Sequence, residues 1–338
     1  MNLKRIRTTE DLSSLISVKA EELTAIIPAE HYRVFQIPKP GTNEKRTIET
    51  PTGRLKEILE RLADPFQWYY CDHKTDAAYG YIRHLANSKD KRNILTNASR
   101  HTGNDYLLNI DIDSFFHQID TPMLRKLFND HTLFTFDTAT EDLLCELVSY
   151  RGRLPMGSPV SPALSNFATI RLDEELLHWC RRNQICYTRY VDDLSFSSGQ
   201  AITDRNYHDI RDIMLSHKFK PDEAKTKWYG KNDIKEITGL VVGKKVGIPE
   251  GFISDFEKSI EKLKQVYLTL SIMPDHHVYD WLDKMRSALE GRLNFIGSIY
   301  GKKHSLYLRL RNMLNEAGQT NPDEAESISW RYIGYEIH

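Results

Sequence analysis

Hydrophobic positions recur along the first third of the chain with two different periods. Apolar residues return at helical spacing across residues 1–30, which predicts a helical N-terminus closed by Pro28. Two alternating runs, 32–37 and 45–50, flank a segment rich in proline and glycine, and this arrangement predicts a β-hairpin. The helical period then returns over residues 53–71.

The middle of the chain places carboxylates at the ends of strands. Residues 106–112 are a nearly unbroken apolar run that ends in acids, which predicts a buried strand. Residues 186–197 predict a strand, a tight turn and a second strand, with Asp192 and Asp193 at the tip. The other predicted elements are helices over 143–148, 159–180 and 205–217, a hairpin over 237–248, and helices from about residue 250 onward.

Composition fits a globular chain with more than one domain-sized unit. The sequence has 338 residues, of which 40% are hydrophobic and 28% charged, and it contains no low-complexity block. No apolar stretch approaches the length of a bilayer span, and no secretory apolar core follows the N-terminus. We therefore expect a cytoplasmic protein without a membrane partner.

Cysteine and charge patterns refine this picture. The four cysteines are scattered without a CxxC pair, which favours reduced, packed thiols and argues against a zinc site. The net charge of −1 hides an acidic stretch over 105–200 and a basic stretch over 216–311. Such a division suits an enzyme that holds metal ions in one place and phosphates in another, although ordinary solvated faces would give the same pattern.

Three acids form the strongest candidate for chemistry. Asp111 ends an apolar strand, and Asp192 and Asp193 lie in the predicted turn. Unpaired acids packed together raise one another's pKa, and a bound divalent cation removes that penalty. Hard oxygen ligands of this kind suit magnesium. An isolated Asp-Asp pair is more often a simple hairpin turn, so the surrounding motifs decide between the two interpretations.

Those motifs occur in a recognisable order. Asp111 is followed by the paired aromatics Phe115 and Phe116. Residues 154–162 are Leu-Pro-Met-Gly-Ser-Pro-Val-Ser-Pro, and residues 190–193 are Tyr-Val-Asp-Asp. This succession resembles the reverse transcriptase family.

The resemblance extends from about residue 31 to about residue 300. Within the family, two further blocks resemble elements of retron enzymes: Asn-Ala-Ser-Arg-His at 97–101 and Ile-Thr-Gly at 237–239. The block at 97–101 taken alone would equally suit a helix cap or a loop. The chain also has no room for the maturase, endonuclease or protease regions of other relatives.

The resemblance implies an α+β right-hand polymerase fold with fingers, an antiparallel-sheet palm and a helical thumb. Residues 1–104 would form an N-terminal helix, the fingers and part of the palm. Residues 105–235 would form the palm with the catalytic carboxylates. Residues 236–338 would form a primer-grip hairpin and a helical, basic thumb.

The resemblance also assigns roles near the three acids. Asp111, Asp192 and Asp193 would be catalytic and would bind two magnesium ions, or manganese in their place, with the Ile112 carbonyl as a further ligand. Phe116 matches the steric gate that excludes a ribose 2′-hydroxyl, although either Phe115 or Phe116 could instead be a core residue.

Further positions would bind nucleotide or nucleic acid. Met156 departs from the glutamine that is frequent in the family, which puts a glutamine-specific role in doubt. Lys225 matches a lysine proposed to protonate pyrophosphate. The nucleotide-binding positions would be Lys39, Arg46, Phe116, Pro155, Met156, Gly157 and Lys225. The RNA- or DNA-binding positions would be Asn97, His101, Thr238, Gly239, Arg286, Arg292, Tyr300, Lys302 and Lys303.

A retron-type enzyme would use a cognate structured noncoding RNA as primer and template. It would consume dNTPs, start DNA at a guanosine 2′-hydroxyl and leave a branched RNA–DNA product. The family also implies antiphage defence with a separate effector protein. Alternatives are another compact defence-associated or diversity-generating reverse transcriptase, a non-copying RNA-binding scaffold, and a nucleotide cyclase, which the intact proline-rich block disfavours.

Overall fold

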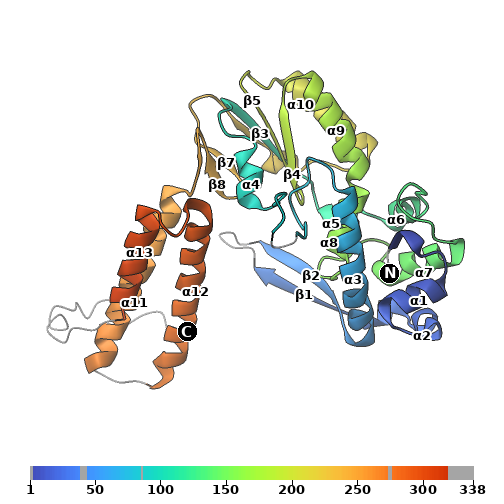
Figure 1. The fold of residues 1–338 in the computed structure, drawn as a ribbon, viewed down its shortest axis with the longest axis horizontal. Coiled ribbons are helices and arrows are strands. Elements are labelled where there is room, and N and C mark those ends of the chain that lie inside the picture. The colour runs from blue at the N-terminus through green and yellow to red at the C-terminus, as the bar shows by residue number, and fades with distance from the viewer. Residues whose placement is uncertain (1–2, 39–43, 85–86, 273–275, 319–338) are drawn as a thin grey trace. The chain divides into compact units, whose positions relative to one another are not determined.

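The computed structural model describes residues 3–38, 44–84, 87–272 and 276–318 (Figure 1). Contacts divide the chain into two compact units, Met1–Thr238 and Gly239–His338. The first unit holds a four-stranded sheet, a separate hairpin and most of the helices, and the second holds a short hairpin and three long helices. Helices and antiparallel strands thus give the α+β architecture that was predicted.

The N-terminal region is helical but broken into short pieces. Ser17 adopts a left-handed conformation with φ 55° at the end of the first α-helix, and Pro28 opens a later 3-10 turn. These two residues explain why the predicted helical region is not one continuous helix. The pieces are η1 (Leu3–Arg5), α1 (Thr9–Ile16), α2 (Ala20–Ala25) and η2 (Pro28–His31).

The predicted hairpin is confirmed. Strands β1 (Tyr32–Pro38) and β2 (Lys45–Pro51) pair antiparallel, with Tyr32 opposite Pro51 and Phe35 opposite Ile48. The chain then enters α3 (Gly53–His73), close to the predicted helix at 53–71. Glu49, in β2, is buried while most of β1 is exposed, so only part of the ribbon packs on the rest of the unit.

The central sheet is antiparallel in the strand order β4-β5-β3-β6 (Figure 1). Its strands are β3 (Tyr106–Asp111), β4 (Cys186–Tyr190), β5 (Asp193–Ser198) and β6 (Lys227–Tyr229). The strand–turn–strand prediction is therefore confirmed. The short strand β6 was not predicted, because three residues are too few to show an alternating pattern.

Helices cover this sheet and bring distant segments together. Helix α9 packs on β4 and α10 packs on α9. The helix predicted over 159–180 is instead two helices that meet at Thr169, whose hydroxyl donates to the carbonyl oxygens of Ser165 and Asn166. The helices of this part are α4 (Ile94–Ser99), α5 (Phe115–Gln118), α6 (Thr121–Phe128), α7 (Thr138–Val148), α8 (Ser161–Ala168), α9 (Ile170–Arg182), α10 (Asp204–Ser216) and η3 (Glu223–Lys225).

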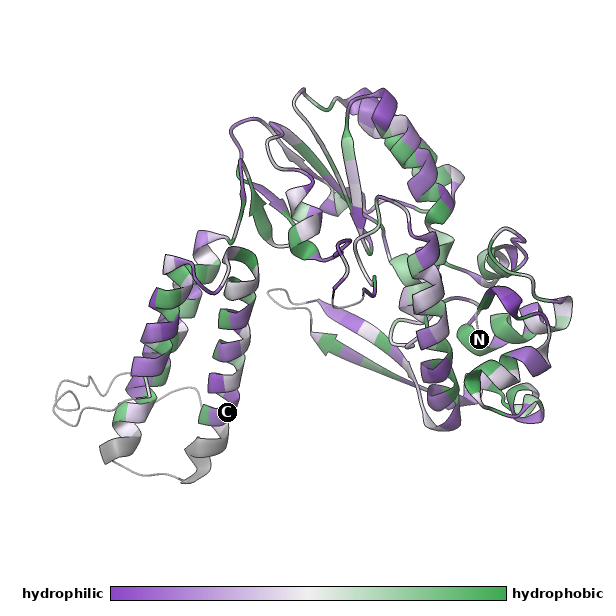
Figure 2. Cartoon of the chain, in the orientation of Figure 1, coloured by the Kyte–Doolittle hydropathy of each residue, from purple (hydrophilic) through white to green (hydrophobic). Residues whose placement is uncertain are grey.

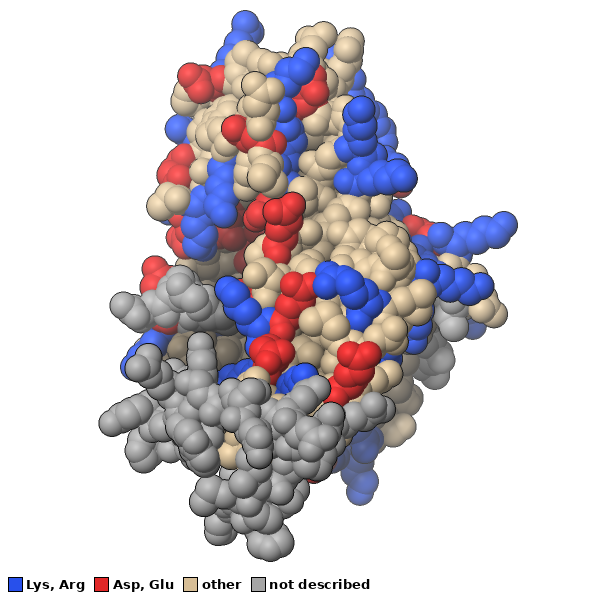
Figure 3. All heavy atoms as spheres, turned by 90° about the vertical axis from the view of Figure 1, so that its left-hand side faces the viewer, with Lys and Arg blue, Asp and Glu red and all other residues tan. Residues whose placement is uncertain are grey.

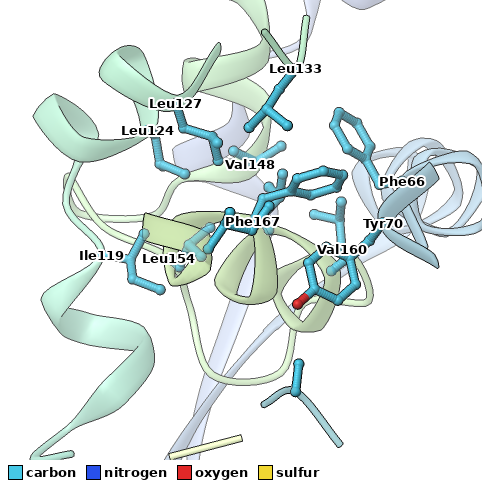
Figure 4. Packing of buried hydrophobic residues seen from close by; sticks show 14 of the residues in the cluster. Phe66, Tyr70, Ile119, Leu124, Leu127, Leu133, Val148, Leu154, Val160 and Phe167 are labelled. Carbon is cyan, nitrogen blue, oxygen red and sulfur yellow. The ribbon is translucent and has the colours of Figure 1, made fainter. Parts of the chain in front are cut away.

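The core of the first unit anchors the loop between α7 and α8. Figure 4 shows Phe66 and Tyr70 of α3 directed toward Phe167 of α8. The Phe167 ring meets the Tyr70 ring edge-on at 5.1 Å between centroids. Leu154 and Val160, which flank the loop, are fully buried in the same cluster. Both ends of the loop are therefore fixed by apolar packing.

The second unit consists of the strands β8 (Leu240–Val242) and β9 (Val246–Gly247) and the helices α11 (Glu250–Ile272), α12 (His276–Tyr300) and α13 (Ser305–Glu316). The three helices pack on one another. Hydrophobic and hydrophilic residues alternate along them in Figure 2, as expected of helices with one buried face. In the first unit, β7 (Lys235–Ile237) lies just before the boundary. Among the described residues, no helix combines the length and apolar character that a membrane span requires.

Candidate active site

Two strand ends and a turn gather the three acids. Asp111 is the last residue of β3 and Asp193 is the first residue of β5, and the two are direct cross-strand partners. Asp192 lies in the two-residue turn between β4 and β5. Carboxylate oxygens of all three residues lie within 4.8 Å of one another. The structure therefore brings together the three acids singled out from the sequence.

The turn that carries Asp192 has an unusual backbone. Val191 has a φ of 63°, a left-handed conformation that a β-branched residue rarely adopts. Such a conformation costs on the order of 1–3 kcal/mol and persists only where the surrounding structure enforces it. The backbone N–H of Ile112 donates to the Asp192 carbonyl oxygen at 3.0 Å, which ties the turn to the end of β3.

The three acids disfavour one another's ionisation. Burial and the charge of Asp111 raise the pKa of Asp192. Partial loss of hydration and the charges of Asp192 and Asp111 raise the pKa of Asp193 to about 7, although this residue stays exposed at the surface. A cation placed among these oxygens would relieve the repulsion.

Two basic residues already lie near the acids. The Lys225 ammonium is 2.8 Å from Asp111 Oδ2 and 2.9 Å from Asp222 Oδ2. Burial opposes the charge of Lys225, but hydrogen bonds to these two carboxylates outweigh burial and raise its pKa, so the lysine is protonated at neutral pH. The positive charge of Arg46, on β2, offsets a small part of the rise in the pKa of Asp192 that burial and Asp111 cause.

The residues present fit a divalent metal site. Three carboxylates supply hard oxygen donors on one sheet edge, and burial together with mutual repulsion raises the pKa of two of them. The site also holds the Lys225 ammonium against Asp111, which shows that positive charge is favoured there. Oxygen donors of this kind suit magnesium, which binds through one or two carboxylates together with substrate phosphates.

The proline-rich loop lies against β2. The backbone N–H of Glu49 donates to the Met156 carbonyl oxygen at 2.7 Å. Gly157 has a φ of 127°, and a Cβ there would lie 2.9 Å from Ile48 Cγ2 and 3.0 Å from the Glu49 carbonyl oxygen. Only glycine permits this approach, so Pro155, Met156 and Gly157 are held next to the hairpin.

A buried carboxylate reinforces that contact and was missed from the sequence. Glu49 is 1% exposed, and its carboxylate accepts hydrogen bonds from both terminal nitrogens of the Arg153 guanidinium, at 2.7 and 3.0 Å. The His117 Nε2 lies 3.4 Å from the same carboxylate. Burial favours the neutral form of Glu49, but the hydrogen bonds and charge of Arg153 outweigh burial and lower its pKa. A lone Glu within a strand pattern carries no sequence signal for this arrangement.

The paired aromatics have separate environments. Phe115 is 3% exposed and belongs to the core, whereas Phe116 is only partly buried. The Phe116 ring lies 6.4 Å from the ring of Tyr81, whose surroundings include the charges of Asp192 and Arg46. Of the two aromatics, Phe116 is therefore the one available to a ligand. Lys39, also predicted to bind nucleotide, lies outside the described residues.

Asn97 and His101 do not have the environment expected of nucleic-acid contacts. Each is 1% exposed. The His101 ring nitrogens lie 2.7 Å from Ser197 Oγ and 2.7 Å from Thr188 Oγ1, so both are occupied within the protein. This burial argues against direct contact with nucleic acid, and the His101 ring instead joins the segment after α4 to β4 and β5. The sequence block resembled a nucleic-acid element because burial cannot be seen from a five-residue motif.

Two of the second unit's predicted contacts are occupied by packing. Arg292 is 4.8 Å from the centroid of Phe252, donates to the Phe252 carbonyl oxygen, and joins α12 to α11. The Tyr300 hydroxyl accepts the backbone N–H of Ile248 at 2.9 Å, and its ring stacks on His304. Within the second unit, the Arg292 guanidinium and the Tyr300 hydroxyl therefore each have a structural partner, and their predicted role in nucleic-acid binding stays a prediction.

Three other predicted contacts, all in the second unit, are accessible. Arg286, Lys302 and Lys303 are exposed. Thr238 and Gly239 both have positive φ, 48° and 78°, at the boundary between the two units. Figure 3 shows Lys and Arg side chains interspersed with Asp and Glu on the face it displays, so the basic residues on that face do not form one continuous patch.

Comparison with known proteins gives the class of this site. The family described as reverse transcriptase (RNA-dependent DNA polymerase) matches residues 37–271. Because the match covers most of the chain, the protein belongs to the reverse transcriptase family. It has the right-hand polymerase fold of that family and is an RNA-directed DNA polymerase.

Within the family, the chain is of the retron type. It is 25% identical to the retron Ec86 reverse transcriptase of Escherichia coli over 333 residues, covering 95% of this chain and 94% of that protein. It is 34% identical to the E. coli retron Ec83 reverse transcriptase over 181 residues, covering 51% and 54%. It is 28% identical to the Myxococcus xanthus retron Mx162 reverse transcriptase over 244 residues, covering 63% and 47%.

A telomerase from Candida albicans, solved with a fragment of telomeric RNA, is a more distant likeness. It matches with a TM-score of 0.42 and 12% identity over 91% of this chain and 63% of that one.

Proposed function

We propose that this protein copies part of a cognate structured noncoding RNA into DNA primed from a guanosine 2′-hydroxyl, giving a branched RNA–DNA molecule. The similarity to a retron reverse transcriptase along nearly the whole chain supports this proposal. The single observation that carries the chemistry is the cluster of Asp111, Asp192 and Asp193, whose oxygens lie within 4.8 Å of one another.

The three aspartates, with the Ile112 carbonyl, would hold two magnesium ions, and manganese could replace them. Bound there, the metal supplies activation of the attacking hydroxyl and neutralisation of the triphosphate charge. The protein's share is to hold the three carboxylates at one sheet edge before substrate arrives, since phosphoryl transfer depends mainly on positioning and electrostatics.

Basic residues near the acids would manage the triphosphate. Lys225 is protonated and next to Asp111, so it can give its proton to the departing pyrophosphate. Arg46, on β2, can bind phosphate oxygens in a bidentate manner. Lys39 would assist in binding the triphosphate.

The deoxynucleotide pocket would lie between Phe116 and the proline-rich loop. Phe116 would exclude a ribose 2′-hydroxyl by its bulk, which is selection through steric exclusion. Pro155, Met156 and Gly157 would line the pocket, with their position set by β2. The Met156 thioether cannot donate a hydrogen bond, so this loop would act through shape.

The structured RNA would contact exposed basic residues of the second unit. Arg286, Lys302 and Lys303 can bind phosphates, and Thr238 and Gly239 would approach the primer. The RNA–DNA product would act in antiphage defence in the cytoplasm, together with a separate effector protein.

Primer extension by the purified protein tests the assignment of the acids. Asp192→Asn should lower the rate of dNTP addition on an RNA template by at least about 100-fold, the effect typical of losing one electrostatic contact to the transition state. Asp113→Asn is the matched control, because Asp113 is an exposed acid two residues from Asp111 and outside the cluster. Equal rates in both variants would refute the assignment.

A further inference from the structure

A fully buried arginine lies three residues before the first turn aspartate. The Arg189 side chain, on β4, is 0% exposed. Its Nε and one terminal nitrogen donate to the two oxygens of Asp173 at 2.9 and 2.8 Å. The other terminal nitrogen donates to the Val191 carbonyl oxygen at 3.0 Å and to Asn166 Oδ1 at 3.1 Å. One guanidinium thus joins α8 and α9 to the turn.

The partners of Arg189 are themselves fixed. Asp173 is 0% exposed and also accepts hydrogen bonds from the hydroxyls of Thr75 and Tyr187, each at 2.9 Å. With four donors on one carboxylate, the buried charge is fully satisfied. Because all three guanidinium nitrogens of Arg189 have hydrogen-bond partners, the side chain is fixed in the orientation that contacts Val191.

The backbone at Gly80 packs against the other side of the turn. Asn166 donates to the Gly80 carbonyl oxygen at 3.0 Å, so the same network fixes the Gly80 segment. A Cβ on Gly80 would lie 2.6 Å from both the backbone nitrogen and Cγ2 of Val191. The turn is held between the Gly80 backbone and the Arg189 guanidinium.

We infer that Arg189, with Asp173 and Asn166, is a positioning group that enforces the left-handed conformation of Val191 and thereby presents Asp192 and Asp193 as preorganised metal ligands. The inference rests on the proposed metal role of these aspartates. Val191 directly precedes them, and its φ of 63° is the conformation that needs enforcement. Ligands held in place before the metal arrives bind it more tightly.

The test measures Mn²⁺ binding by the full-length protein, by electron paramagnetic resonance, beside its thermal unfolding. Arg189→Lys keeps a positive charge opposite Asp173, but its single nitrogen cannot span Asp173, Asn166 and Val191 together. Tyr187→Phe is the matched control, since it removes another hydrogen bond from Asp173 without touching the turn. We expect roughly 10- to 100-fold weaker Mn²⁺ binding in Arg189→Lys than in Tyr187→Phe, the range for residues that orient metal ligands.

Gly80→Ala provides a second route that leaves the buried ion pair intact. Its Cβ would displace Val191 from the opposite side, so Mn²⁺ binding should weaken there too. This variant decides the matter if Arg189→Lys does not fold. Wild-type Mn²⁺ affinity in folded Arg189→Lys or in Gly80→Ala would overturn the inference.

An Asp192→Asn, Asp193→Asn double variant separates this inference from the proposed metal site. If the wild-type protein binds Mn²⁺ no better than the double variant, the metal role fails and this inference fails with it. If the wild-type protein binds Mn²⁺ and the double variant does not, unchanged affinity in Arg189→Lys counts against the positioning role alone.

Discussion

His101 is a buried polar residue that connects two strands of the sheet that carries the three acids. Its ring nitrogens form hydrogen bonds with the hydroxyls of Thr188, on β4, and Ser197, on β5. Burial lowers the pKa of His101 to about 3, so the ring is neutral in the folded protein. The unfolded chain, by contrast, binds a proton near the ordinary value of 6.5.

That difference predicts acid sensitivity. Below pH 6.5 the unfolded state binds a proton that the folded state excludes, so the free energy of unfolding should fall as pH falls, by at most about 1.4 kcal/mol per pH unit from this residue. Urea unfolding at pH 7, 6 and 5 measures the slope. His101→Gln should flatten it, whereas His131→Gln, at an exposed position, should not. An unchanged slope in His101→Gln would contradict this account.

Phe116 gives a prediction about sugar selection. Phe116→Val removes the aromatic ring, while Phe115 keeps the core intact. The ratio of kcat/KM for dNTP over rNTP should fall by roughly 10-fold or more, since loss of a steric barrier is worth at least about 1.4 kcal/mol. Single-nucleotide addition with dGTP and GTP measures the ratio. An unaltered ratio would remove Phe116 from the gate.

The sequence predicted residues that lie at exposed strand ends better than residues that lie inside. Asp111, Asp192 and Asp193 were found because acids at the end of an apolar strand and in a turn stand out from the pattern. The burial of Asn97 and His101 was not predicted, because a short motif does not distinguish a buried polar residue from one that contacts nucleic acid. Arg189 was not singled out, because a single arginine in a predicted strand does not show whether its side chain is buried.

At the level of elements, the hairpin and the proline-rich loop behave as one assembly. The Glu49 backbone bonds to Met156, and the Glu49 side chain accepts Arg153 just before the loop. The buried end of β2 and the loop that follows α7 are therefore joined by both backbone and charge. A change at Glu49 should affect folding stability and nucleotide binding together.

Glu49→Gln tests this joint. The variant should lose about 1.5–3 kcal/mol of unfolding free energy, the range for hydrogen bonds to charged groups. It should also raise the KM for dNTP, because the loop loses its support. Glu57→Gln is the control: its pair with Arg54 is exposed, and exposed pairs contribute at most about 1 kcal/mol. Equal destabilisation of the two variants would contradict the coupling.

Helices and strands were predicted correctly where the hydrophobic pattern is clear in the sequence. They were missed where tertiary contacts determine the boundary or the pairing of an element. The β1–β2 hairpin, α3 and the β4–β5 turn were all predicted. The division between α8 and α9 was not, because the apolar period continues across Thr169 and only its hydroxyl bonds mark the junction. Likewise, β6 is defined by pairing to β3 and not by its own sequence.

At the scale of the whole molecule, the chain joins a polymerase unit to a helical one. The three acids all belong to the first unit, while Arg286, Lys302 and Lys303 belong to the second. The acidic stretch over 105–200 and the basic stretch over 216–311 predicted that the acids and these basic residues lie in different parts of the chain. The identity of the RNA cannot be predicted in this way, because recognition of a folded RNA depends on shape and 2′-hydroxyls and not on a short motif.

The most direct test of the account is to express the chain with its flanking genomic DNA in a heterologous bacterium and examine the extracted nucleic acid. We predict a short, discrete DNA whose size shifts after RNase and debranching treatment, and its absence in the Asp192→Asn, Asp193→Asn double variant. If that DNA persists in the double variant, or if the wild-type chain yields no branched DNA while its purified form extends a supplied primer on RNA, the proposed function is contradicted.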